Sequence, residues 1–299
     1  MSIDFNKSES GFENFSLKRN PASPRTLFGL IMSSIAGFFT LLAIIPLIII
    51  LTYLLTKGIS SLSLAVFTEL PPPPLVDGGG FGNAILGTVI MVGIGALISV
   101  PIGIMAAIYL SEFNEGKAAE WIRFATNVLS GVPSIIVGVF AYSAVVLTTK
   151  TYSAWAGGFA LSILMLPIIV RTTDESLKLV PQEVRQASVG IGANQYQTVL
   201  QVVLPAALPA IITGVTLSIA RAAGETAPLL FTALFTQYWP NWNNGLAEPT
   251  ASLAVLVYNF AIVPFKNQQE LAWGAAFILV LLVLTTSIIS RIATAKRTY

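Results

Sequence analysis

Long apolar stretches separated by short polar ones dominate the chain. A helix needs about 20 apolar residues to cross the roughly 30 Å apolar core of a bilayer. Six stretches are long enough, and they lie near residues 27–56, 84–110, 124–148, 154–170, 207–236 and 271–291. The pattern predicts an all-α integral membrane protein with six transmembrane helices.

Polar stretches complete the predicted organisation. Residues 1–26 form a polar tail, and residues 292–299 form a second, shorter one. Residues 57–83 form an extracytoplasmic loop, because Pro71–Pro74 and Gly78–Gly80 cannot continue a helix. The first apolar run exceeds the 7 to 15 apolar residues of a cleaved secretory signal, so we expect a retained membrane anchor.

Composition and charge agree with this assignment. The chain is 55% hydrophobic and only 10% charged, with a mean hydropathy of +0.78. If the N-terminus is cytoplasmic, twelve of the 16 Lys and Arg residues lie inside, one lies within a span, and three lie outside, namely Lys57, Lys150 and Lys266. The positive-inside rule therefore predicts that both termini are cytoplasmic. A net charge of +2 gives no reason to expect nucleic-acid binding.

The residue inventory disfavours an enzyme. The chain has no Cys and no His, which excludes disulfides, thiol nucleophiles and imidazole bases. Asp4, Asp77 and Asp174 all lie outside the predicted spans, so an intramembrane aspartyl dyad is not available. The sequence also lacks a Gly-x4-Gly-Lys-Ser/Thr loop, so we expect this chain to bind no cofactor and any ATP hydrolysis to come from another chain. An intramembrane enzyme is the disfavoured alternative from a different class.

The predicted cytoplasmic loop at residues 172–205 is long for a connection between spans. After Pro181, the residues Val184, Ala187 and Ile191 fall on one face of a helix. Beyond a glycine joint, a second short helix is predicted with Tyr196, Val199, Leu200 and Val203 on its apolar face. This pattern favours a docking surface over a passive channel or a scaffold, while a pair of membrane-surface helices without a partner stays open.

Two ionisable residues fall within the fifth span. Arg221 lies about 18 Å along the helix from Pro209, past the middle of the bilayer core, and Glu225 shares its helical face. An arginine there costs about 2.5–3.5 kcal/mol, so it should face protein or water. Either the two residues only neutralise each other, or Arg221 attracts a passing oxyanion while Glu225 holds its side chain. Thr226 adds a hydroxyl, and Gly224 and Pro228 predict a helix interruption.

The loop carries a family resemblance. Its segments Gln186-Ala187-Ser188, Gly192 and Val202-Val203-Leu204-Pro205 resemble the EAA loop of bacterial ABC-transporter membrane subunits. That resemblance implies a coupling helix seated in a groove of an ATP-hydrolysing subunit. The family's Glu and second Ala are here Gln186 and Ser188, which removes one charge but keeps hydrogen-bonding capacity.

Further blocks resemble the PstA-type permeases of phosphate importers. They are Ala107–Glu112, Ser130–Ser134, Leu166–Thr173 and Ala220–Leu230. The resemblance implies the ABC type I importer permease fold over residues 84–291, in a bacterial plasma membrane. It also implies a PstC-like permease subunit as heterodimer partner, two copies of a PstB-like ATPase that binds ATP-Mg, a PstS-like binding protein and inorganic phosphate as substrate. A PstC-type sister subunit and a permease for another oxyanion stay open as alternatives.

Overall fold

The computed structural model describes residues 23–113 and 116–295, with side chains up to residue 292. The predicted tails at 1–26 and 292–299 therefore lie for the most part outside the described residues. The chain divides into two compact units, Met1–Tyr53 and Leu54–Tyr299. Among the described residues every regular element is a helix, as predicted for an all-α protein.

The first unit is described by most of one helix, α1 (Pro24–Ser60), whose last residues belong to the second unit. Pro46 lies inside this helix without ending it. Its most apolar 18-residue window has a mean hydropathy of 2.7 and is only 6% buried. Apolar side chains exposed along a whole helix suit a hydrocarbon environment, which agrees with the predicted membrane anchor.

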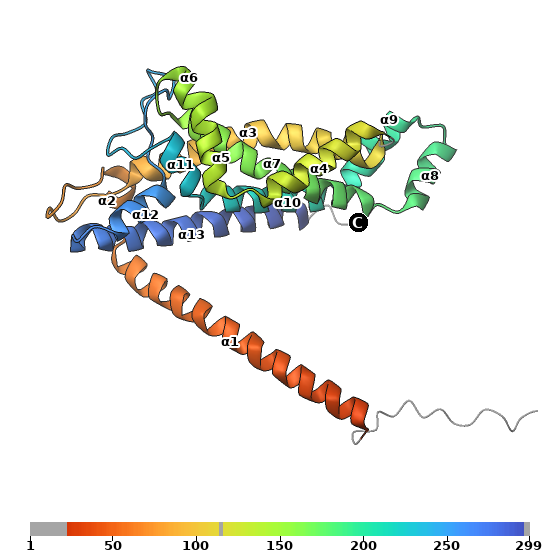
Figure 1. Cartoon of the computed structure of the whole chain (residues 1–299), viewed down its shortest axis with the longest axis horizontal. Helices are drawn as coiled ribbons and strands as arrows, with labels where there is room; N and C mark the ends of the chain where they lie inside the picture. Colours follow the sequence, from red (N-terminus) through yellow and green to blue (C-terminus); the bar gives the residue numbers. More distant parts are fainter. Residues whose placement is uncertain (1–22, 114–115, 296–299) are drawn as a thin grey trace, which may run out of the picture. The chain divides into compact units, whose positions relative to one another are not determined.

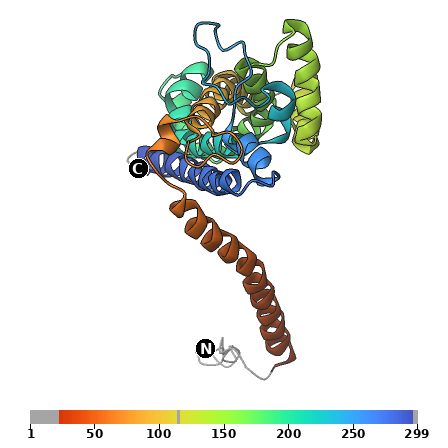
Figure 2. The same ribbon diagram turned by 90° about the vertical axis from the view of Figure 1, so that its left-hand side faces the viewer.

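The second unit contains the remaining helices (Figures 1 and 2). They are α2 (Ala65–Thr68), α3 (Gly82–Glu112), α4 (Lys117–Gly131), α5 (Ser134–Ala141), α6 (Leu147–Thr149), α7 (Ala154–Lys178), α8 (Gln182–Gly190), α9 (Gln195–Thr198), α10 (Leu204–Ala223), α11 (Ala227–Thr232), α12 (Leu253–Ala261) and α13 (Lys266–Ala295), with π-helical turns at Tyr142–Val146 and Val199–Val203. Figure 1 shows α3, α7, α10 and α13 with their axes roughly parallel, as in a bundle.

Helix α7 lies at the centre of this bundle, and glycines allow its neighbours to approach it closely. A Cβ added to Gly158 of α7 would lie 2.4 Å from Cγ2 of Ile94 in α3. A Cβ added to Gly214 of α10 would lie 2.2 Å from Oγ1 of Thr172 in α7. Small residues at such crossings are the usual device for packing helices in a membrane. Helices α3 and α10 therefore both pack closely against α7.

Five helical segments are long and apolar enough to span a membrane, against the six predicted. They are α1, α3, α7, the continuous segment Gln195–Ala223 and the α13 segment Lys266–Ile292. The span predicted at 124–148 is not one straight helix, because Lys117–Gly131 and Ser134–Thr149 meet at an angle of 107°. Val132 is extended, as the residue before a proline prefers, so the break falls at Val132–Pro133. A sixth span exists only if this bent pair counts as one.

The fifth predicted span is also not a single helix. Helix α10 ends at Ala223 and the short α11 begins at Ala227, so residues 207–236 are interrupted. Gly224 is the C-terminal cap of α10, and Pro228 lies in the first turn of α11. Proline is tolerated in a first turn because the N–H that it lacks would have no helical partner there. The interruption predicted between Gly224 and Pro228 is confirmed.

The loop predicted at 172–205 is shorter than expected. Residues 172–178 belong to α7, and residues 195–205 already belong to the long helix that continues through α10. The second short helix is therefore the start of a span. Leu204 and Pro205 lie inside continuous helix, directly after the π-helical turn Val199–Val203. Such a turn accommodates a proline that cannot donate a regular helical hydrogen bond.

Candidate functional site

The first candidate region is residues 179–198, which we call the coupling segment. Pro181 precedes α8, and Gly192 has a φ of +93°, a left-handed conformation that glycine adopts without steric cost. Asn194 then starts α9 through a capping box: its Oδ1 accepts from the N–H of Gln197 at 2.9 Å, and Gln197 accepts from the N–H of Asn194. The predicted helix, glycine joint and helix are confirmed (Figure 1).

The inner face of the coupling segment is polar. Arg185 forms an ion pair with Glu112, the last residue of α3, and donates from Nη2 to the carbonyl oxygen of Leu177 at 2.8 Å. Gln195 donates to the backbone carbonyl of Glu112 at 2.8 Å. Sequence reasoning missed these contacts, because Arg185 and Glu112 are separated by 73 positions. The sequence offered one signal for such a contact, namely the charge of Arg185 on the less apolar side of the predicted helix.

Several apolar side chains of the coupling segment are exposed. Leu179 is 78% exposed, Val184 40%, Val189 58% and Ile191 89%. Of the residues aligned with the EAA loop, Gln186 and Ala187 are also exposed. Large apolar side chains exposed close together on a polar segment are typical of a protein interaction site. The predicted face of Val184 and Ile191 therefore points away from this chain.

Other predicted coupling residues have structural contacts within the segment. Ser188 is buried, and its hydroxyl lies 3.0 Å from that of Thr198, which ties α8 to α9. On the second predicted apolar face, Val199 and Val203 are buried. The remaining two members of that face, Tyr196 and Leu200, are exposed. The second predicted apolar face is therefore packed against this chain only on the side of Val199 and Val203.

The second candidate region is the break between α10 and α11. Arg221 and Glu225 face each other across the end of α10, with Nε and Oε1 3.7 Å apart. The distance is that of an ion pair but exceeds a normal hydrogen bond, so the guanidinium retains donors for a third group. The Arg221 side chain is 61% exposed and that of Glu225 only 16%. This chain therefore encloses the carboxylate and leaves the positive charge on its surface.

Close contacts hold the break in place. A Cβ on Gly138 of α5 would lie 2.7 Å from Cα of Pro228, and Leu229 is buried in the core. Thr226 is partly buried directly after Glu225, and its carbonyl oxygen accepts the N–H of Leu229 at 3.1 Å. The predicted path residues Arg221, Glu225 and Thr226 thus meet at one interrupted point of the bundle.

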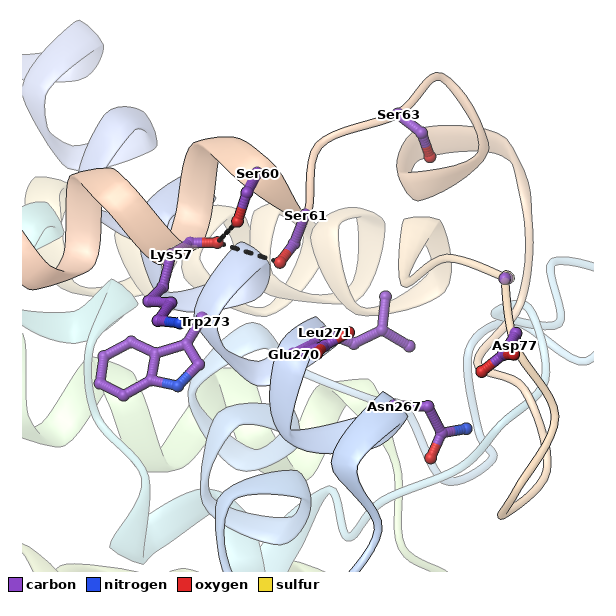
Figure 3. A pocket seen from close by; sticks show the side chains of 11 residues that line it. Lys57, Ser60, Ser61, Ser63, Asp77, Asn267, Glu270, Leu271 and Trp273 are labelled. Carbon is purple, nitrogen blue, oxygen red and sulfur yellow. Dashed lines mark hydrogen bonds between the residues drawn. The ribbon is translucent and has the colours of Figure 1, made fainter.

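A separate cavity of about 630 Å³ lies between residues 57–63, residues 77–79 and the start of α13 (Figure 3). Its lining includes the ammonium of Lys57 and the carboxylates of Asp77 and Glu270. Two negative charges against one positive charge do not favour an oxyanion. The cavity therefore does not resemble a phosphate site, and no predicted site residue lies in it.

Comparison with known proteins identifies the family of the chain. Residues 99–298 match the family model described as the binding-protein-dependent transport system inner membrane component. The chain is 42% identical, over 84% of each chain, to the phosphate transport system permease protein PstA of Yersinia pestis. It is 35% identical to the phosphate transport system permease protein PstA 1 of Mycobacterium tuberculosis, over 92% of this chain and 93% of that one.

The chain belongs to the PstA-type permeases of the binding-protein-dependent transport family. Members of this family are membrane subunits of ABC importers, so the chain is a permease subunit rather than an enzyme, and it works with ATPase and binding-protein partners. Its place is the inner membrane.

Solved structures support the same fold. The chain superposes on a permease of the MetNI methionine ABC transporter with a TM-score of 0.60 at 20% identity, covering 72% of this chain and 95% of that one. A chain of a bacterial alginate ABC transporter gives a TM-score of 0.59 at 14% identity, covering 88% and 92%. These PstA-type residues therefore adopt the ABC type I importer permease fold, as the sequence resemblance implied.

Proposed function

We propose that this chain forms half of the translocation path of an ATP-driven importer of inorganic phosphate. The similarity to PstA permeases along most of the chain carries the proposal. Two features of the chain support it: an apolar docking face on the coupling segment, and an exposed arginine at a helix break within the apolar bundle. The other membrane subunit is a PstC-like permease.

The coupling segment receives the ATPase in this proposal. The exposed side chains of Val184, Val189 and Ile191, with Gln186 and Ala187 beside them, seat in a groove of a PstB-like subunit. Two copies of that subunit bind ATP-Mg and supply the hydrolysis. Burying one large aliphatic side chain contributes about 1.5–3 kcal/mol, so three or four of them suffice to anchor the contact.

The break at Arg221 supplies the path. Lipid disfavours a charged side chain, so the exposed side of Arg221 faces the PstC-like subunit and the water-filled path between the two permeases. Arg221 attracts the phosphate oxyanion there, since a guanidinium offers paired donors to phosphate. Glu225 orients Arg221 and prevents the anion from binding too tightly, and Thr226 contributes a hydroxyl.

The topology follows from the charge distribution. Both termini and the coupling segment lie in the cytoplasm, where most Lys and Arg residues collect. The loop at residues 57–83 and the cavity beside Lys57 lie outside, on the side where a PstS-like protein delivers phosphate. The permease core spans residues 84–291, and residues 27–56 form the separate anchor.

Uptake by the complete complex tests the proposal. The complex is purified through a tag on this chain, reconstituted in lipid vesicles and supplied with ATP and the phosphate-binding protein. We expect accumulation of radiolabelled phosphate but not of radiolabelled sulfate, and none when ATP is replaced by a non-hydrolysable analogue. Sulfate uptake at the same rate would assign another oxyanion, and uptake without ATP would contradict an energy-coupled importer.

A further inference from the structure

Both helices of the coupling segment are tied to one residue, Glu112, at the end of α3. Arg185 of α8 forms an ion pair with the Glu112 carboxylate, and Gln195 of α9 donates to the Glu112 carbonyl oxygen at 2.8 Å. These ties come from opposite sides of the glycine joint. Tyr196 adds a ring contact with Phe113, 5.1 Å between centroids, so the segment meets α3 at its last residue and its C-terminal cap.

The same guanidinium also reaches α7. Its Nη2 donates to the carbonyl oxygen of Leu177 at 2.8 Å, one residue before α7 ends at Lys178. The last carbonyl groups of a helix have no partner within the helix, and the helix C-terminus carries partial negative charge. Arg185 therefore satisfies the end of α7, and its charge also compensates the carboxylate of Glu112, which the end of α3 by itself disfavours.

Burial distinguishes this ion pair from the others. The side chains of Arg185 and Glu112 are 17% and 7% exposed. The pair between Arg171 and Glu175, also near the end of α7, is 68% and 62% exposed. Salt and water screen exposed pairs strongly and partly buried ones much less. The contact between Arg185 and Glu112 is thus suited to persist when the coupling segment moves.

We infer that Arg185 is a positioning residue that makes the coupling segment move as one body with the inner ends of α3 and α7. Helix α7 meets α10 at the close contact between Thr172 and Gly214, and α10 ends at the break beside Arg221. Motion imposed on α8 thereby reaches the break through packed helices. The inference rests on the proposed function, since the motion has a source only if an ATPase docks on the segment.

The first test measures phosphate ions accumulated per ATP hydrolysed in the reconstituted complex. Arg185→Gln should lower this ratio at least roughly tenfold, because the ion pair with Glu112 and the hydrogen bond to the Leu177 carbonyl are lost together, while the ATPase still copurifies. Lys178→Gln, which removes a charge from the same helix end but leaves Glu112 paired, should change it less than about twofold.

A double-mutant cycle separates coupling from general damage. Glu112→Gln should also lower the ratio, and the double variant should be no worse than Arg185→Gln alone, because either single change already removes the contact between the two residues. A normal ratio for Arg185→Gln, or losses that multiply in the double variant, would overturn the inference. A lack of phosphate uptake by the unaltered complex would instead count against the proposed function.

A distance measurement tests the inference without measuring phosphate transport. The chain has no Cys, so Met105→Cys on α3 and Glu183→Cys on α8 provide two unique sites for spin labels. With Arg185 present, the distance between the labels should stay the same with and without ATP. With Arg185→Gln, the distance distribution should broaden. A distance that shifts on ATP binding while Arg185 is present would show that α8 moves independently of α3.

Discussion

The coupling segment and the helix break at Arg221 are built in opposite ways. The segment keeps the charge of Arg185 inside and exposes apolar side chains, of which Ile191 is 89% exposed. The break keeps apolar residues such as Ala222 and Ala223 inside and exposes the charge of Arg221. Each region exposes the kind of group that its proposed surroundings, water for the segment and membrane for the break, disfavour most. Each is therefore completed by another chain or by the transported ion.

The largest expected effect concerns the exposed charge. Arg221→Ala should lower phosphate uptake about a hundredfold, the order found when one preorganised donor is removed from a site. The complex should still assemble, because this chain leaves most of the Arg221 side chain exposed and builds little packing on it. Uptake of radiolabelled phosphate by reconstituted vesicles checks the effect.

Two control variants sharpen that prediction. Arg221→Lys keeps the charge but loses the planar pair of donors. Its phosphate uptake should therefore lie between that of the unaltered protein and that of Arg221→Ala. Lys57→Ala removes a positive charge from the separate cavity at residues 57–63 and 77–79 and should leave uptake unchanged. Equal losses for Lys57→Ala and Arg221→Ala would point to a general charge effect.

A smaller effect is expected at the apolar face. Ile191→Asp places a charge where the ATPase is proposed to bury an aliphatic group worth about 1.5–3 kcal/mol, so affinity for the ATPase should fall at least about tenfold. Leu64→Asp is a matched control, because Leu64 is 86% exposed but lies outside the coupling segment. Copurification at increasing salt measures the difference. Equal retention of the ATPase by both variants would contradict docking on this face.

The smallest effect is expected at the glycine joint. Gly192 has a φ of +93°, and no heavy atom lies within 4 Å of a Cβ added there. Gly192→Ala should therefore cost only about 1–2 kcal/mol of backbone strain and lower coupling about fivefold. Gly192→Trp adds a bulky side chain at the same position. A clearly larger loss with Trp than with Ala would locate the ATPase beside this joint, whereas equal losses would place it elsewhere.

Local chemistry made several features predictable from the sequence. The helices around Gly192 and the interruption between Gly224 and Pro228 follow from glycine, proline and short-range apolar spacing. The sequence did not predict which of the prolines breaks a helix. Pro46 and Pro167 lie inside α1 and α7, whereas the chain bends at Pro133. That choice depends on how neighbouring helices pack, which spacing along the chain does not encode.

The candidate sites divide in the same way. Arg221 and Glu225 are four residues apart on one helix, so their pairing could be predicted from helical geometry. The pairing of Arg185 with Glu112 depends on the fold bringing together two distant helix ends. The burial of Ser188 against Thr198 also needed the structure, because the sequence places Ser188 among residues expected to dock.

The central claim is that docking and ion passage occur in different regions of one chain. Phosphate uptake and ATP hydrolysis, measured in the same vesicles for Arg221→Ala, test it most directly. The account predicts that uptake falls about a hundredfold while the ATPase stays bound and continues to hydrolyse ATP. Undiminished phosphate uptake by this variant would contradict the account.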